Sequence, residues 1–411
     1  MNNIIEEDNF CLIKTNKYKT IDLFLYFTCE YDSLKKTALS LLSNFIGEYS
    51  KKYNDKVKMT RAKDNLYGAN ISCAVKGKAN LLSYCVKYSF INPKFLKDIT
   101  IDDYLAYFKE CLYNIYFSDE LLDEFKRNLK DTVLRSLDKP SNLATNRVNQ
   151  IIAGVDKKFA VYDIDCLKEI EQVDLEMIKK TYEDLFENYA RDVYLIGDVS
   201  EKLIDYVKTL KNDKHFYLKN EPMMLKEIGE IIEDKEVSQS NLNVVYRTPY
   251  NRKHPCFYAY MLGNVLLGMV PTSLLFEEVR EKLSLCYYIS IYDYKNEGLV
   301  KIYTAIDGKN KEEVLKQISI QMKRLIDKDY DYSKIDSARA LLIDSVTSLS
   351  DSLDGYVDYL YTNKLNGIKC DIEEYIDGVN RVTVDDIASC FKEYKYVLTY
   401  MLNGVKDEES L

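Results

Sequence analysis

The pattern of apolar and polar positions divides the chain into short strands and amphipathic helices. Alternating or continuous apolar residues predict strands at 10–16, 21–29, 69–75, 81–90, 192–196, 241–247, 285–291, 299–306 and 396–402. Helical spacing predicts helices at 33–49, 101–116, 119–137, 142–154, 174–186, 200–210, 254–267, 311–326, 332–349, 352–365, 371–378 and 384–393, and a short one ending at 66. Helices and antiparallel hairpins in this mixture indicate an α+β fold.

The least periodic stretch, 213–240, is polar and charged, and it predicts a linker. It divides the chain into an N-terminal domain, 1–212, and a C-terminal domain, 241–411. Short similarities recur in the same order in both halves: Leu42-Ser43-Asn44 and Leu262-Gly263-Asn264, Arg61…Leu66 and Arg280…Leu285, Val173…Ile178 and Val382…Ile387. The sequence therefore predicts a duplicated α+β domain.

Composition changes this picture only by exclusion. With 46% apolar and 30% charged residues, the chain is typical of a globular protein. Its net charge of −9, with no basic stripe, argues against nucleic acid as a partner. Ten scattered cysteines without a C-x-x-C spacing are typical of reduced thiols. The acidic start MNNIIEEDNF does not resemble a signal peptide, and no apolar run approaches 18 residues, so we expect a cytoplasmic protein without a membrane partner.

Most catalytic chemistry is missing. The two histidines, His215 and His254, cannot form the H-x-x-E-H or H-x-x-x-H pair that binds zinc on one helix. There is no G-x-S-x-G elbow and no Gly-rich phosphate loop. We therefore predict no metal, no cofactor and no catalytic activity in this chain alone.

Helical spacing also predicts a helix from 272 to 283, before the strand at 285–291. The remaining candidates are Arg280, in the last turn of that helix, and Tyr287, at the start of the strand. In one interpretation Arg280 pairs with Glu277 or Glu281 on a solvated face, and Tyr287 packs at a strand edge. In the other, guanidinium and phenol project from one corner and donate hydrogen bonds to a peptide carbonyl.

The segment around this pair, LLFEEVREKLSLCYYIS (274–290), resembles the C-terminal domain of pitrilysin/insulinase-type (inverzincin) metallopeptidases. NLYGANIS (65–72) and LIGDVS (195–200) are similar to other segments of that family. The form REK-x-SL-x-YY resembles most its zinc-less bacterial subunits associated with the 5-aminopentanol modification of elongation factor P.

This resemblance implies two homologous domains, each a mainly antiparallel sheet backed by helices, which together make half of a peptidase clamshell. In that family one half supplies zinc and the other an Arg/Tyr pair that grips the substrate backbone. The resemblance places the pair at Arg280 and Tyr287, whereas strand alternation is expected to aim Tyr288 at the opposite face.

The chain departs from the family at the zinc helix. Ser40, Ser43 and Asn44 stand where His, Glu and His are expected, and no carboxylate aligns cleanly as the third ligand, although Glu124 is close. Hydroxyl and amide groups without imidazole do not bind zinc or activate its water. The resemblance therefore implies a non-catalytic member.

Three hypotheses follow. The chain is a partner subunit that completes the chamber of a zinc-bearing homologue as a heterodimer, or pairs with a second copy of itself, and binds peptide through Arg280 and Tyr287. Alternatively it is an assembly scaffold from the same family that binds no peptide. The third hypothesis, a self-sufficient peptidase with a cryptic site, has the least support because the zinc residues are missing.

Overall fold

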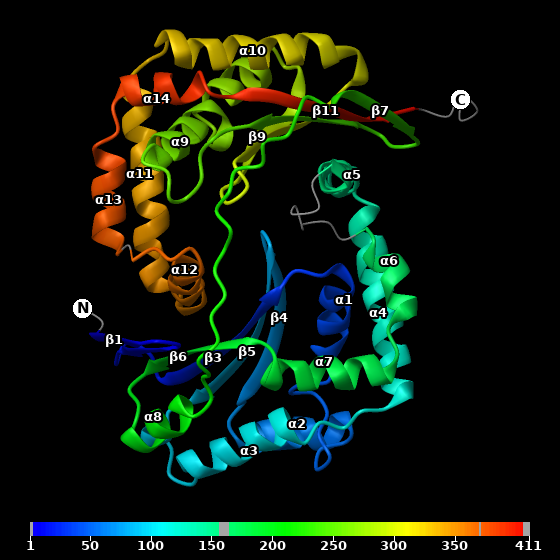
Figure 1. Ribbon diagram of the computed structural model, residues 1–411, viewed down its shortest axis with the longest axis vertical. Coiled ribbons are helices and arrows are strands. Elements are labelled where there is room, and N and C mark those ends of the chain that lie inside the picture. Colours follow the sequence, from blue (N-terminus) through cyan, green and yellow to red (C-terminus); the bar gives the residue numbers. More distant parts are fainter. Residues whose placement is uncertain (1–2, 156–163, 370, 406–411) are drawn as a thin grey trace. The chain divides into compact units, whose positions relative to one another are not determined.

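The computed structural model describes residues 3–155, 164–369 and 371–405, which divide into two compact units (Figure 1). Unit 1 comprises the described residues within 1–134 and 163–216, and unit 2 those within 135–162 and 217–411. The chain therefore enters unit 2 for residues 135–162 and returns to unit 1 before the second half begins.

Unit 1 is built on a six-stranded sheet of order β1-β2-β6-β3-β5-β4. In chain order its strands are β1 (Asn3–Glu7), β2 (Phe10–Lys14), β3 (Thr20–Glu30), β4 (Asn70–Lys78), β5 (Leu81–Ile91) and β6 (Ala190–Gly197). Only β2 and β6 are parallel neighbours, and the other pairs are antiparallel. Such a sheet buries apolar side chains on the face that its helices cover.

The helices of unit 1 are α1 (Ser33–Leu42), α2 (Lys56–Asn65), α3 (Ile101–Tyr113), α4 (Asp119–Leu137), α6 (Cys166–Glu169), α7 (Leu175–Glu187) and α8 (Glu201–Lys208). Leu39 of α1, Phe108 of α3 and Leu185 of α7 meet the inward side chains of β3 and β5 in one core. Most of these helices begin at a polar cap, such as Asp32 before α1, which satisfies their free N–H groups.

Unit 2 repeats this arrangement. Its sheet has the order β7-β11-β8-β10-β9, with strands β7 (Gly229–Lys235), β8 (Ser240–Arg247), β9 (Cys286–Tyr294), β10 (Leu299–Ile306) and β11 (Lys395–Gly404). Each strand occupies the place of its counterpart five earlier in unit 1, and the parallel pair β7–β11 matches β2–β6. The predicted α+β fold of two homologous domains is therefore confirmed.

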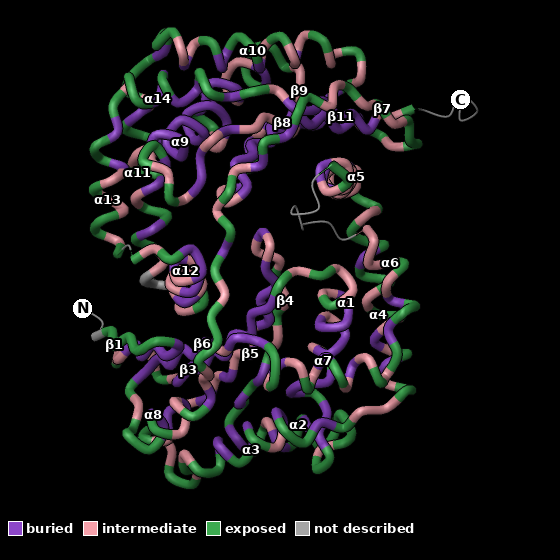
Figure 2. The backbone as a smooth tube through the Cα atoms, in the orientation of Figure 1, coloured by how far each residue is buried: buried purple, intermediate pink, exposed green. Residues whose placement is uncertain are grey.

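The helices of unit 2 are α5 (Pro140–Val155), α9 (Phe257–Asn264), α10 (Lys311–Asp327), α11 (Ser333–Thr347), α12 (Leu353–Leu365), α13 (Ile372–Asn380) and α14 (Val384–Phe391), with π-helical segments at Val265–Met269 and Phe276–Lys282. Helix α9 is buried around most of its circumference (Figure 2). No helix within the described ranges is long and apolar enough to cross a bilayer.

The sheet of unit 2 is covered on both faces. Val300 and Ile302 of β10 point into the core under the helices, whereas Leu299 belongs to a second cluster with Val148 and Ile152 of α5. We call the face under α5 the outer face (Figure 1). Because α5 supplies its cover, β10 is buried on both sides and reads as an almost continuous apolar run.

These units differ from the predicted boundaries in two places. Helix α5, expected in the N-terminal domain, packs on the sheet of unit 2, because its apolar side chains match the outer face. The expected linker 213–240 contains β7, an edge strand whose polar residues hide its periodicity. The helix expected over 33–49 ends at Leu42, and the chain continues in turns through Gly47, whose φ is +82°.

Candidate functional site

The candidate site lies where the π-helix Phe276–Lys282 turns into β9. The amide of Leu283 donates to the carbonyl of Glu278, at 3.0 Å, which gives the wide turn of a π-helix. Ser284 then adopts a left-handed conformation with φ of +50°, unusual for a residue with a side chain. This sharp corner brings the end of the helix back beside the first residues of the strand.

Tyr287 sits in a β-bulge of the edge strand β9. Cys286 pairs with Ile306 and Tyr288 with Ala305, so Tyr287 between them has no partner across the ladder. A bulge redirects the side chain of the extra residue. The Tyr287 side chain is accordingly among the most exposed aromatic groups, at 59%.

Arg280 contacts the main chain of Tyr287, not its phenol ring. Its Nε donates to the Tyr287 carbonyl oxygen at 3.0 Å, and its Nη1 pairs with the Glu281 carboxylate at 3.0 Å. The guanidinium carbon lies 4.7 Å from the centre of the Phe276 ring. The expected Arg–Tyr proximity is therefore present, and within the described chain the second terminal nitrogen, Nη2, has no hydrogen-bond partner.

Tyr288 is held differently from its neighbour. Its hydroxyl donates to Oδ1 of Asn241 at 3.3 Å, and its ring contacts Tyr303 edge-on. Burial raises the pKa of the Tyr288 phenol. Tyr288 is thus committed to contacts with β8 and β10, whereas the Tyr287 side chain is the more exposed of the two.

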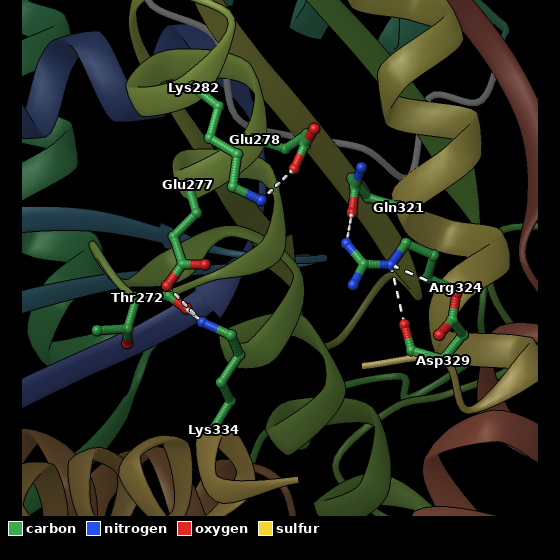
Figure 3. A network of polar contacts seen from close by, with 8 residues as sticks. All are labelled: Thr272, Glu277, Glu278, Lys282, Gln321, Arg324, Asp329 and Lys334. Carbon is green, nitrogen blue, oxygen red and sulfur yellow. Dashed lines mark hydrogen bonds and ion pairs between the residues drawn. The ribbon is translucent and has the colours of Figure 1, made fainter. Parts of the chain in front are cut away.

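A second layer fixes the helix that carries Arg280. Lys334 of α11 donates to the carbonyl of Thr272 at 2.8 Å and forms an ion pair with Glu277 (Figure 3). Lys282 pairs with Glu278 one turn along at 2.8 Å. Sequence reasoning missed Lys334, because no local pattern connects it to a residue 57 positions earlier.

The residues at the family's zinc position are used within their own helix end. Ser40 Oγ donates to the carbonyl of Lys36, and Ser43 Oγ to that of Leu39, both at 2.9 Å. The Asn44 amide donates to the carbonyl of Ser40 at 3.1 Å, and Glu124 pairs with Lys56. In the described part of the chain, no three His, Cys, Asp or Glu residues gather in a way that could hold a metal ion.

Comparison with known proteins agrees with this geometry. A family described as "Peptidase M16 inactive domain" matches residues 172–342, a segment that includes Arg280 and Tyr287. The "probable inactive metalloprotease YmfF" of Bacillus subtilis (strain 168) is 24% identical over 409 residues, covering 96% of this chain and 95% of that protein. The chain is similar to inactive M16 peptidases.

Two crystal structures share the fold of this chain. A conserved protein from Enterococcus faecalis V583 has a TM-score of 0.90 at 23% identity and covers 98% of both chains. A peptidase M16 inactive domain from Pseudomonas fluorescens has a TM-score of 0.77 at 15% identity over 99% of both. The two sequence matches confirm the family resemblance expected from the sequence, and the subgroup linked to elongation factor P stays a prediction.

Proposed function

We propose that this M16 homologue is the non-catalytic subunit of a zinc peptidase pair and binds the substrate backbone through Arg280 and Tyr287. Its partner would be a zinc-bearing homologue; the alternative partner is a second copy of the chain. The observation that carries the proposal is the state of Arg280: its guanidinium is held by Tyr287, Glu281 and Phe276, yet keeps Nη2 unpaired within the described chain.

A fixed guanidinium is suited to a peptide carbonyl. Holding the side chain in place lowers the entropy lost on binding, and a hydrogen bond from a charged donor is stronger than a neutral one. The exposed phenol of Tyr287 offers a second donor on the same corner. Together they could grip one peptide group.

Strand β9 supports this role because it is an open edge. Edge strands usually carry charged side chains that hinder pairing with another chain. At the other edge of the same sheet, β7 carries Glu230, Glu233, Asp234 and Lys235, whereas β9 has no charged residue from Cys286 to Tyr292. A peptide could add to β9 by main-chain hydrogen bonds.

The zinc would have to come from the partner. Ser40, Ser43 and Asn44 direct their donors to carbonyls of their own helix, and these groups are poor zinc ligands. The scattered cysteines support a reducing compartment, so we place the pair in the cytoplasm.

The test is reconstitution with a zinc-bearing homologue, using a fluorogenic peptide and kcat/KM as the readout. Removing a charged hydrogen-bond donor typically costs about 1.5–3 kcal/mol, so Arg280→Ala is expected to lower kcat/KM by roughly 10- to 100-fold. The matched control is Arg381→Ala, since Arg381 is 81% exposed and pairs with Asp377 one turn away. Activity should stay within about twofold for that variant.

Tyr287→Ala should reduce activity as well, and neither site variant should change the melting temperature of the chain. If Arg280→Ala leaves kcat/KM at the wild-type value, the site assignment is wrong.

The scaffold hypothesis is favoured by a specific observation: three groups of the chain already contact Arg280, as in a packed corner. It predicts that Arg280→Ala weakens assembly with the partner while peptide binding is unchanged. Analytical ultracentrifugation and fluorescence anisotropy would separate the two outcomes.

A further inference from the structure

Lys301 is a cation in the middle of an otherwise apolar strand. It lies in β10 between Val300 and Ile302, which point into the helix-covered core, so its own side chain points to the outer face. Only 3% of its surface is exposed. Lysine is almost never buried to this extent unless it is paired.

The contacts of Lys301 include no counter-charge. Its ammonium donates to Oγ1 of Thr145 in α5 at 3.0 Å. It also lies 5.4 Å from the ring centre of Tyr303, 5.8 Å from that of Tyr292 and 6.0 Å from that of Tyr294. Among the described residues, no carboxylate forms an ion pair with Lys301.

Three ring faces and one hydroxyl only partly replace the water that an ammonium loses on burial. Burial lowers the pKa of Lys301 to about 8, so the amine is still mostly protonated at pH 7. A carboxylate is the group that would complete its surroundings, because it supplies both the missing charge and acceptors for the remaining N–H bonds.

The site is close to the open edge of the sheet. Tyr292 of β9 is directly opposite Lys301 in the strand pairing, and its side chain is 52% exposed. The Tyr292 ring is therefore both close to the ammonium, at 5.8 Å, and partly exposed to solvent. A shift of this ring is the movement that a ligand would need to reach Lys301. Tyr292 follows Tyr287 by five residues on the same edge strand, about 17 Å along β9.

We propose that Lys301 binds a carboxylate of an extended peptide lying along β9, about five residues from the peptide group held by Arg280. The inference rests on the proposed function, because it assumes that peptide binds at this edge. It makes the subunit selective for peptides with an acidic side chain or a free C-terminus at that spacing.

The test uses the full chain and three fluorescein-labelled decapeptides of one Ser/Thr/Val sequence. The first has a Glu near its amidated C-terminus, the second has Gln there, and the third has Gln and a free terminal carboxylate. Fluorescence anisotropy at low salt should show the Glu or free-carboxylate peptide binding about tenfold tighter than the neutral one. Comparison of the first and third peptides shows whether Lys301 binds a Glu side chain or a free C-terminal carboxylate.

Lys301→Met should abolish this preference and leave the affinity for the neutral peptide within about twofold; Lys301→Gln replaces it if that variant does not fold. Lys309→Met, which removes an ammonium that is 77% exposed, should keep the preference. Arg280→Ala should weaken all three peptides equally.

A preference that survives in Lys301→Met, or that disappears equally in Lys309→Met, overturns the inference while the Arg280 site stands. If no peptide binds the wild-type chain, the proposed function fails and this inference fails with it.

Discussion

Glu297 provides a quantitative test of the unit 2 hairpin. It lies in the turn between β9 and β10, is 7% exposed, and burial raises the pKa of its carboxyl to about 7. Burial also raises the pKa of Asp293, near the end of β9. The perturbation is Glu297→Gln, which keeps the shape of the side chain and removes its titration.

The sign follows from the two protonation states. An unfolded glutamate has a pKa of about 4.5, so between pH 4.5 and 7 the folded chain retains a proton that the unfolded chain has lost. The stabilisation by neutral Glu297 is therefore complete below pH 4.5 and is lost as the pH rises through 7. The difference between these pKa values corresponds to roughly 3 kcal/mol.

We expect Glu297→Gln to match the wild type near pH 4 and to be more stable by roughly 3 kcal/mol at pH 8. The assay is urea unfolding followed by circular dichroism at four pH values in that range. Glu312→Gln is the control, because the Glu312 side chain is 85% exposed and should show no such trend. A stability difference between Glu297→Gln and wild type that stays constant with pH would refute the reasoning.

Two further changes test the packing of unit 2. Lys334→Met removes the contacts with Thr272 and Glu277 that hold the helix of Arg280, and it should lower the free energy of unfolding by about 1–3 kcal/mol. In a double-mutant cycle with Glu277→Gln the two losses of stability should not add. Strict additivity would contradict an interaction between Lys334 and Glu277. Gly263→Ala would place a Cβ 2.4 Å from Phe391 in the core and should cost about 1–3 kcal/mol. Gly154→Ala, whose Cβ would meet no described atom within 4 Å, should be neutral or slightly stabilising in thermal melts.

Most of the elements were predictable from the sequence because burial leaves a periodic signal. Strand β10 is an example, with Val300, Ile302, Thr304 and Ile306 on one face as expected. The signal fails at edges. Strand β7 exposes alternate residues to solvent on one face and pairs on one side only, so its sequence GEIIEDK has too few apolar positions to stand out.

Assignment of α5 to unit 2 was beyond the sequence for a different reason. Its apolar residues Ala144, Val148 and Ile152 predict a helix with one buried face, but they do not identify the sheet that covers it. Chain order suggested the first domain. The outer face of the second sheet was the better match, a long-range choice that local periodicity does not encode.

The candidate site was predictable only in part. The spacing of Arg280 and Tyr287 across a helix–strand corner predicted their proximity, but not that Arg280 would bond to the carbonyl of a bulged residue. The bulge arises from pairing with Ala305 and Ile306, which the sequence does not specify. Lys301 is visible in the sequence as a lysine inside an apolar strand. Its burial could not be predicted, because it depends on α5, whose Thr145 accepts the Lys301 hydrogen bond.

Five strands have the same order in the two units, so the two sheets can be compared strand by strand. In unit 1 the polar side chains at the end of α1 donate their hydrogen bonds to carbonyls of the same helix, as Ser43 does to Leu39. In unit 2 the matching helix α9 is buried. The corner before β9 carries Arg280, whose Nη2 has no partner within the described chain, and the exposed side chain of Tyr287. Because groups already bonded within the fold have little to offer a ligand, we propose the β9 edge of unit 2, and not the end of α1, as the place where this chain would bind a peptide.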